Sequence, residues 1–275
     1  MISRRIVTRN PALTLGCLLL AALVSVALAA PWLYPDDPRD MVAPALLVVG
    51  ADLNFPLGTD ALGRDVAAGI AYGARTSLLL GALAAGCATA IGMLLGLVAG
   101  YARGWVDGLL MRLCELFQTI PHFLLALFVV AILGATLRNI VLAITLTSWP
   151  GVARLVRSQT LVLRELDFVR IAPAMNVGRL RVILTHLVPN VLPTVVTNAS
   201  ILAAVAILGE SGLSFLGLGD PRLVSWGGML GEGRDMIRTI PSLTLLPGAA
   251  IVLTVLGLNL LGDGLNQALD PRRRS

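Results

Sequence analysis

The run PALTLGCLLLAALVSVALAAPWL, residues 11–33, decides the fold class of this chain. It contains no charged side chain, and at about 1.5 Å per residue a helix of this length reaches about 34 Å. The hydrocarbon core of a bilayer is about 30 Å thick, so the segment is long enough to cross a membrane. Arginines precede the run at positions 4, 5 and 9, and aspartates follow it at 36, 37 and 40. Since positive charge is retained on the cytoplasmic side, we expect a cytoplasmic N-terminus.

A cleaved signal peptide is the alternative interpretation of this first run. Ala27-Leu28-Ala29 resembles the small-residue site at which such peptides are cut. The apolar run is long for a signal peptide, and further apolar segments follow it. A retained membrane helix is therefore the favoured interpretation.

Composition extends the membrane interpretation to the whole chain. Of 275 residues, 56% are apolar and 13% are charged, whereas about a quarter of an average soluble domain is charged. The predicted spans are residues 11–33, 77–99, 109–133, 140–163, 187–208 and 243–261. The predicted fold is an all-α polytopic transmembrane helical bundle of about six spans, with both ends of the chain in the cytoplasm.

Three parts are expected along the chain. Residues 1–72 form an N-terminal transmembrane helix followed by an external segment, residues 73–263 form the main transmembrane domain, and residues 264–275 form a cytoplasmic tail. Within the main domain, residues 164–186 form the longest polar stretch on the cytoplasmic side.

The distribution of basic residues fits this topology and argues against nucleic acid as a partner. All 21 basic residues are arginines, and fourteen of them fall on the predicted cytoplasmic side. No soluble basic domain is present in which they could gather as a nucleic-acid footprint. Membrane lipid is therefore the expected surrounding.

Catalytic, metal and cofactor sites are not indicated. The three cysteines lie in or beside apolar stretches, and the two histidines, His122 and His186, stand without a Cys or carboxylate cluster. Gly209-Glu210-Ser211-Gly212 has the shape of an intramembrane serine protease motif, but no histidine follows it to act as a base. A phosphate-binding Gly-x-x-x-x-Gly-Lys loop is missing as well, so the chain is not expected to hydrolyse nucleotide.

Glycines repeat on the second predicted span. Gly92, Gly96 and Gly100 are four residues apart, so they lie on one helical face where a second backbone can approach closely. We expect a helix-packing ridge there.

The cytoplasmic stretch 164–186 contains an apolar stripe. Phe168, Ile171, Ala172 and Met175 recur at helical spacing, while Asp167 and Arg170 fall elsewhere on the wheel. Two interpretations stay open from periodicity alone. The helix lies at the lipid headgroups, or it inserts its apolar face into a groove on a soluble partner.

Short motifs along the chain identify a family resemblance. They are GTDALGRD at 58–65, AGY at 99–101, IP at 120–121, FV at 168–169, PN at 189–190, SFLGLG at 214–219, WG at 226–227, GD at 262–263 and LDPR at 269–272. In this order they resemble the inner-membrane permeases of ATP-binding-cassette importers for dipeptides, oligopeptides and nickel, specifically the second of two paired permeases. The resemblance covers residues 58–272 and implies a type I importer transmembrane domain.

The resemblance gives the cytoplasmic stripe a role. It implies that the stripe is a coupling helix that docks on an ATPase subunit. Its residues are Asp167, Phe168, Arg170, Ile171, Ala172, Met175 and Gly178. The chain departs from the family pattern at Arg170 and Ile171, where Glu and Ala are usual, and at Pro173 and Asn176.

The resemblance also implies partners. They are a homologous permease, two cytoplasmic ATPases that hydrolyse the ATP, and an external solute-binding protein, at a bacterial plasma membrane. The cargo is expected to be a peptide, or nickel or a metal chelate, and this chain is expected to bind no cofactor itself. The alternative is a stand-alone channel or structural membrane protein without an ATPase.

Overall fold

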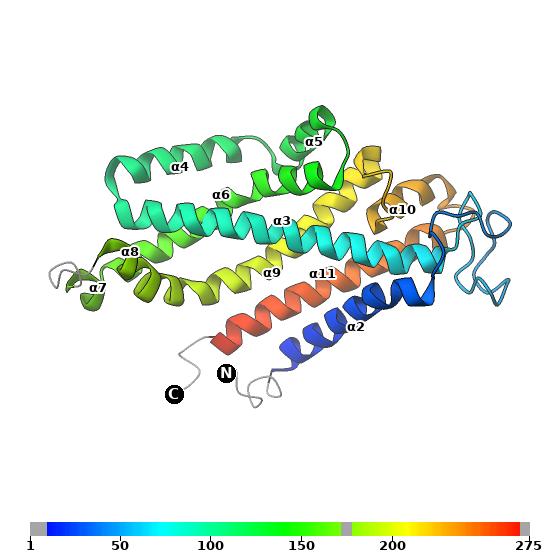
Figure 1. Ribbon diagram of the computed structural model, residues 1–275, viewed down its shortest axis with the longest axis horizontal. Helices are drawn as coiled ribbons and strands as arrows, with labels where there is room; N and C mark the ends of the chain where they lie inside the picture. The colour runs from blue at the N-terminus through cyan, green and yellow to red at the C-terminus, as the bar shows by residue number, and fades with distance from the viewer. Residues whose placement is uncertain (1–9, 172–177, 270–275) are drawn as a thin grey trace.

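The computed structural model describes residues 10–171 and 178–269, and these fold into one helical bundle (Figure 1). Apart from two isolated β-bridges, regular structure in these ranges is helical. The helices are α2 Pro11–Leu33, α3 Val66–Ala102, α4 Gly104–Thr119, α5 His122–Leu133, α6 Leu137–Arg164, α7 Asp167–Ile171, α8 Arg179–Val182, α9 Val188–Leu213, α10 Trp226–Gly233 and α11 Ser242–Leu269. π-helical turns at Ile183–Leu187 and Ser214–Leu218 extend α9 at both ends, and a 3-10 turn follows α10.

Five helical stretches are long and apolar enough to cross a membrane, and α4 with α5 supplies a sixth span if the bent pair counts as one. The predicted all-α polytopic bundle of about six spans is therefore confirmed. The first span matches its predicted bounds, with Asn10 capping the N-terminus of α2 through a bond from Leu13 N.

The third span is broken, whereas a single helix over 109–133 was predicted. α4 and α5 meet at an angle of 83° around Ile120 and Pro121. Proline has no amide hydrogen and disfavours helical geometry in the residue before it, and Ile120 is accordingly extended, with φ −91° and ψ 133°. The apolar run continues across the break, which is why composition did not mark it.

Two spans are longer than their apolar windows. α3 begins at Val66 rather than near 77, because Asp65 caps it by accepting a hydrogen bond from Ala67 N at 2.8 Å. The span that contains α9 runs from Arg179 to Leu218, so the polar stretch between α6 and this span is shorter than the predicted 164–186. The helices of a bundle can therefore be longer than the segments that cross the hydrocarbon layer.

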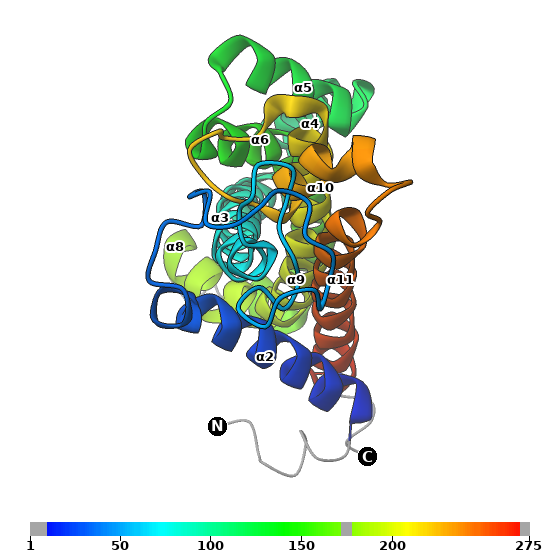
Figure 2. The ribbon, with the colours of Figure 1, turned by 90° about the vertical axis from the view of Figure 1, so that its right-hand side faces the viewer.

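α3 lies at the centre of the bundle. It packs mainly on α6 and α9, while α11 packs on α2 and α9. Figure 2 looks along the helices and shows α4 and α5 on one side of α3 and α2 on the other. Buried clusters join α3 to α6 and α9 along their length, so these three helices form the core.

The broken span follows α6 in the antiparallel direction despite its bend. Arg157 and Asp107 form an ion pair near the start of α4, and the rings of Phe117 and Trp149 meet edge to face with centroids 5.6 Å apart. At the break, Nδ1 of His122 lies 2.9 Å from the carbonyl oxygen of Thr147. Thr147 is ten residues into the 28-residue helix α6, about 15 Å from its start, so the break lies about a third of the way along α6 from the α10 end.

The bundle has two different ends. One, called here the α7 end, carries α7, α8 and the chain between α3 and α4. The other, the α10 end, carries residues 34–65, α10 and the segment after α9 (Figure 1).

Candidate functional site

The short helix α7 carries the predicted coupling segment at the α7 end. Val169 is 3% exposed and belongs to a buried cluster with Val156 of α6 and Val191 of α9. Ile171, by contrast, is 54% exposed. Val169 therefore packs α7 against the bundle, whereas Ile171 is exposed on its surface.

The remaining predicted coupling residues divide into three groups. Asp167 begins α7, and Phe168 and Arg170 lie within it. Gly178 precedes α8, where its carbonyl oxygen accepts a bond from Val182 N at 3.1 Å. Ala172 and Met175, with Pro173 and Asn176, lie outside the described residues. The docking role of this segment therefore stays a prediction.

Polar contacts anchor the base of α7. Arg103, at the end of α3, forms an ion pair with Glu165. The Arg164 guanidinium donates to the carbonyl oxygen of Tyr101 and lies 5.5 Å from the centre of its ring. The last turn of α6, from which α7 follows, is therefore tied to the last turn of α3.

The three glycines of the predicted ridge face α6. A Cβ on Gly92 would lie 2.5 Å from Val152 Cβ, one on Gly96 would lie 2.5 Å from Ala153 O, and one on Gly100 would lie 2.6 Å from Thr160 Cβ. Real Cβ atoms do not approach other atoms this closely. Any side chain at these positions would push α3 and α6 apart.

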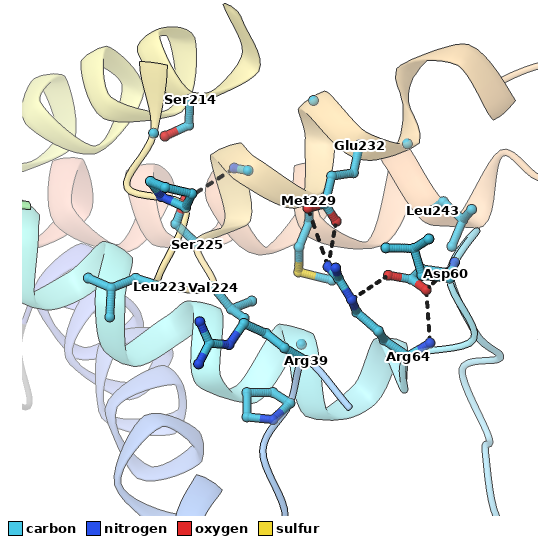
Figure 3. A pocket seen from close by; sticks show the side chains of 18 of the residues that line it. Arg39, Asp60, Arg64, Ser214, Leu223, Val224, Ser225, Met229, Glu232 and Leu243 are labelled. Carbon is cyan, nitrogen blue, oxygen red and sulfur yellow. Dashed lines mark hydrogen bonds and ion pairs between the residues drawn. The ribbon is translucent and has the colours of Figure 1, made fainter. Parts of the chain in front are cut away.

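A pocket of about 660 Å³ opens at the α10 end (Figure 3). Its walls are formed by residues 38–39 and 60–69, the segment after α9, α10 and Leu243 of α11. Arginines and carboxylates both line it, together with the apolar side chains Leu223, Val224 and Met229. The volume lies within the range of small-molecule sites in proteins.

Arg64 and its acidic neighbours form the charged wall of this pocket. Nη1 of Arg64 lies 3.4 Å from both carboxylate oxygens of Glu232, and Nε lies 3.9 Å from Asp60 Oδ2. Figure 3 shows the Arg64 side chain between these two carboxylates. Burial raises the pKa of the nearby Asp65 carboxyl above its usual value, although Ala67 N donates to it.

A buried polar network stands behind the pocket. Glu210, 2% exposed in α9, accepts hydrogen bonds from Ser214 Oγ at 2.6 Å and Ser225 Oγ at 2.7 Å. Ser225 caps α10 by accepting from Gly228 N, and Trp226 Nε1 donates to the carbonyl oxygen of Ile70 in α3. The network joins α9, α10 and α3. The predicted span ended at residue 208, so Glu210 was expected in a loop and this network was not predicted. The spacing of four residues between Glu210 and Ser214, one helical turn, was the available signal.

The serine of the Gly209–Gly212 motif is buried. Ser211 is 6% exposed, and a Cβ on Gly227 would lie 2.5 Å from the Ser211 Cα, so α10 covers the motif at close range. A substrate has no access to its hydroxyl in this arrangement.

Fold and site together define a multi-pass helical membrane protein with the short helix α7 at one end and a pocket at the other. The chain belongs to the family of binding-protein-dependent transport system inner membrane components, whose profile matches residues 92–275. It is 38% identical over 273 residues to the glutathione transport system permease protein GsiD of Pectobacterium atrosepticum, covering 99% of this chain and 90% of that protein.

Two further relatives are equally similar. The dipeptide transport system permease protein DppC of Alkalihalophilus pseudofirmus is 38% identical, covering 97% of this chain and 88% of the relative. The di/tripeptide transport system permease protein DppC of Pseudomonas aeruginosa is 38% identical, covering 94% of this chain and 88% of the relative.

The chain is therefore a permease subunit of an ATP-binding-cassette importer, as the sequence motifs implied. The stand-alone channel is not favoured. Family membership places the chain in a membrane as a multi-pass protein and implies an ATPase and a substrate-binding protein as partners. The family is one of transport permeases rather than enzymes.

Proposed function

We propose that this chain forms half of the path by which small peptides, of about the size of di- and tripeptides and glutathione, enter a bacterial cell. The observation that carries the proposal is near full-length similarity, at 38% identity, to permeases named for glutathione, dipeptides and di/tripeptides. These names favour peptides over nickel or a metal chelate as the cargo.

The α7 end faces the cytoplasm in this proposal, with both ends of the chain on that side. Fourteen of the 21 arginines lie on the side predicted to be cytoplasmic, among them Arg103, Arg157, Arg164, Arg179 and Arg181 at the α7 end. Carboxylates gather at the α10 end: Asp36, Asp37, Asp40, Asp52, Asp60, Asp65, Asp220, Glu232 and Asp235. Retention of positive charge in the cytoplasm favours this orientation.

Two ATPase subunits in the cytoplasm supply the free energy, and one of them receives the segment Asp167–Gly178. Support comes from α7, which exposes Ile171 on a base tied to α3 and α6. Movement of this segment switches the bundle between inward and outward access. The chain itself binds neither ATP nor another cofactor.

A homologous permease closes the other side of the path. Support comes from the break between α4 and α5, where His122 is exposed beside Thr147, about 15 Å along α6 from the α10 end. Ionisable side chains and interrupted helices at membrane depth face protein or a water-filled cavity rather than lipid. The break therefore faces the partner or the path between them. The external solute-binding protein delivers the peptide at the α10 end.

Reconstitution tests the proposal. The chain is purified with the second permease, the ATPases and the binding protein encoded beside it, and uptake of tritiated alanyl-alanine into proteoliposomes is measured with ATP on the ATPase side. Uptake that needs ATP and the binding protein is expected. An otherwise identical complex with an inactive ATPase is the control. Uptake without ATP, or a complex that carries nickel but no peptide, contradicts the proposal.

A further inference from the structure

Arg64 has more hydrogen-bond donors than its neighbours use. A guanidinium carries five N–H groups in a planar fork. Within the described part of the chain, its side chain donates only from Nη1, to Glu232 at 3.4 Å, and its buried Nε makes no hydrogen bond. Charge-assisted bonds of this type are usually about 2.7–2.9 Å long. The cation is therefore under-coordinated where it lines the pocket.

The neighbouring carboxylate does not fill this gap. Asp60 Oδ1 accepts from Leu62 N and from Arg64 N, both at 2.8 Å, and so holds its own turn in place. Its other oxygen stays 3.9 Å from Arg64 Nε. The Arg64 backbone is fixed by this turn, since Asp60 N also donates to Arg64 O. The loop thus holds the guanidinium in position but does not accept hydrogen bonds from its N–H groups.

Glu232 on the facing wall is the complementary group. Its side chain is 60% exposed and meets Arg64 only through the two long contacts. If Arg64 turned to another carboxylate, Glu232 would be free to receive an ammonium group. Because the Glu232 side chain is mostly exposed, it can move away from Arg64 and leave the spacing of about 7 Å that the two charged ends of a dipeptide require.

The shape of the pocket fits such a ligand. An extended dipeptide spans about 7 Å between its charged ends. The cavity of about 660 Å³ accommodates it, and Leu223, Val224 and Met229 provide apolar surface for side chains. A single acidic side chain of a docking protein would leave most of this volume unused.

We propose that this pocket is a peptide-binding site at the outer mouth of the permease, in which Arg64 binds the terminal carboxylate and Glu232 the terminal ammonium of a free peptide. The inference rests on the proposed function. It adds a contact that the chain itself makes with its cargo after the binding protein releases it. No bond is made or broken in this step, and one internal ion pair is exchanged for two with the ligand.

Direct binding tests the site. Affinity of the permease–ATPase complex for tritiated alanyl-alanine is measured without the binding protein, and uptake is measured in parallel with it. Arg64→Gln is expected to weaken peptide binding by about tenfold or more, the usual effect of removing a charge-assisted contact. Glu232→Gln is expected to weaken it by about two- to fivefold, because its charge is exposed and screened. C-terminally amidated alanyl-alanine should bind wild type as poorly as the acid form binds Arg64→Gln.

Arg238→Gln is the matched control. Arg238 follows α10 on the same outer face, is exposed and does not line the pocket. Its substitution should leave peptide affinity unchanged. Thermal unfolding of each variant complex checks that the turn at 60–64 is retained.

The outcomes separate the two proposals. Absence of peptide uptake by the complete wild-type system overturns the proposed function. Normal uptake with equal peptide affinity in wild type and Arg64→Gln overturns the site alone. Weakened affinity of Arg64→Gln for the binding protein, with peptide binding unchanged, would show that Arg64 receives a side chain of that protein, and it also overturns the site.

Discussion

The carboxyl of Glu210 and the hydroxyl of Ser225 are joined by a hydrogen bond of 2.7 Å that fastens the end of α9 to the start of α10. The same carboxyl oxygen accepts from Ser214, and the Ser225 hydroxyl accepts from Gly228 N. One buried oxygen therefore holds both the segment after α9 and the N-cap of α10, which are parts of the pocket wall.

Replacing Glu210 tests this network. Glu210→Ala removes the shared acceptor of two buried hydroxyls and should lower the free energy of unfolding by about 1–3 kcal/mol. Glu210→Gln retains an oxygen that can accept these hydrogen bonds in a side chain of the same shape. It should therefore lower the free energy of unfolding clearly less than Glu210→Ala does. Thermal unfolding of the purified complex in detergent measures both. Equal stability of the alanine variant and wild type would contradict the role assigned to this carboxyl.

Replacing a glycine of α3 by alanine should change the stability of the protein in opposite directions at a site inside the ridge and at a site outside it. Gly96→Ala places a Cβ 2.5 Å from the backbone oxygen of Ala153 and should destabilise by about 1–3 kcal/mol, because backbone cannot move aside. Gly86→Ala, on the same helix, meets nothing within 4 Å and should stabilise by about 0.5–1 kcal/mol. Unfolding midpoints in one detergent give the comparison, and a common sign for both changes would refute it.

The two described faces of α7 predict different defects. Val169→Asp puts an unpaired charge into the core and should prevent stable folding. Ile171→Asp changes an exposed residue and should alter stability by no more than about 0.5 kcal/mol. If the segment docks on the ATPase, Ile171→Asp nevertheless lowers substrate-stimulated ATP hydrolysis by about tenfold or more. Full hydrolysis in this variant would remove the exposed face of α7 from the coupling interface.

Asp220 predicts a pH dependence of stability. Its side chain is 5% exposed and accepts from Leu137 N at 3.0 Å, and hydrogen bonds from Arg222 hold the pKa of the carboxyl below its usual value. A lowered folded-state pKa stabilises the fold above the unfolded-state pKa, and this contribution is lost as pH falls through the folded-state value.

Wild type should therefore exceed Asp220→Asn in stability at neutral pH by about 1 kcal/mol, and the difference should shrink as the pH falls below the usual aspartate pKa of about 3.9. Asp235→Asn serves as the control, since that side chain is 81% exposed and its ion pair with Arg234 is long, at 3.6 Å. A difference between wild type and Asp220→Asn that does not change with pH would show that charge at this position is irrelevant.

The spans were predictable because each contains enough apolar residues to cover the bilayer. The break at Ile120–Pro121 was not, since Pro121 is one of several prolines in or beside predicted spans, and α6 continues through Pro150. Whether a proline ends a helix depends on the packing of the neighbouring turn, which local sequence does not contain. The starts of α3 and of the α9 span were missed for a related reason: polarity marks the edge of the membrane and not the end of a helix.

The candidate sites were predictable to different degrees. Glycine spacing identified residues that the structure places against α6, because close helix packing leaves a local signal. The pocket and the Glu210 network depend on contacts between segments far apart in the chain, such as Arg64 with Glu232 and Trp226 with Ile70. Such pairs carry no local periodicity, so only the fold brings them together.

The burial of Val169 has a mechanical consequence for the bundle. Its cluster contains side chains of α3, α6 and α9, so a force applied to α7 is shared among three helices at once. The glycine contacts leave no free space between α3 and α6, so we expect these two helices to move together as one rigid unit. A displacement of α7 would therefore be passed to α3, α6 and α9 together and not to one helix alone.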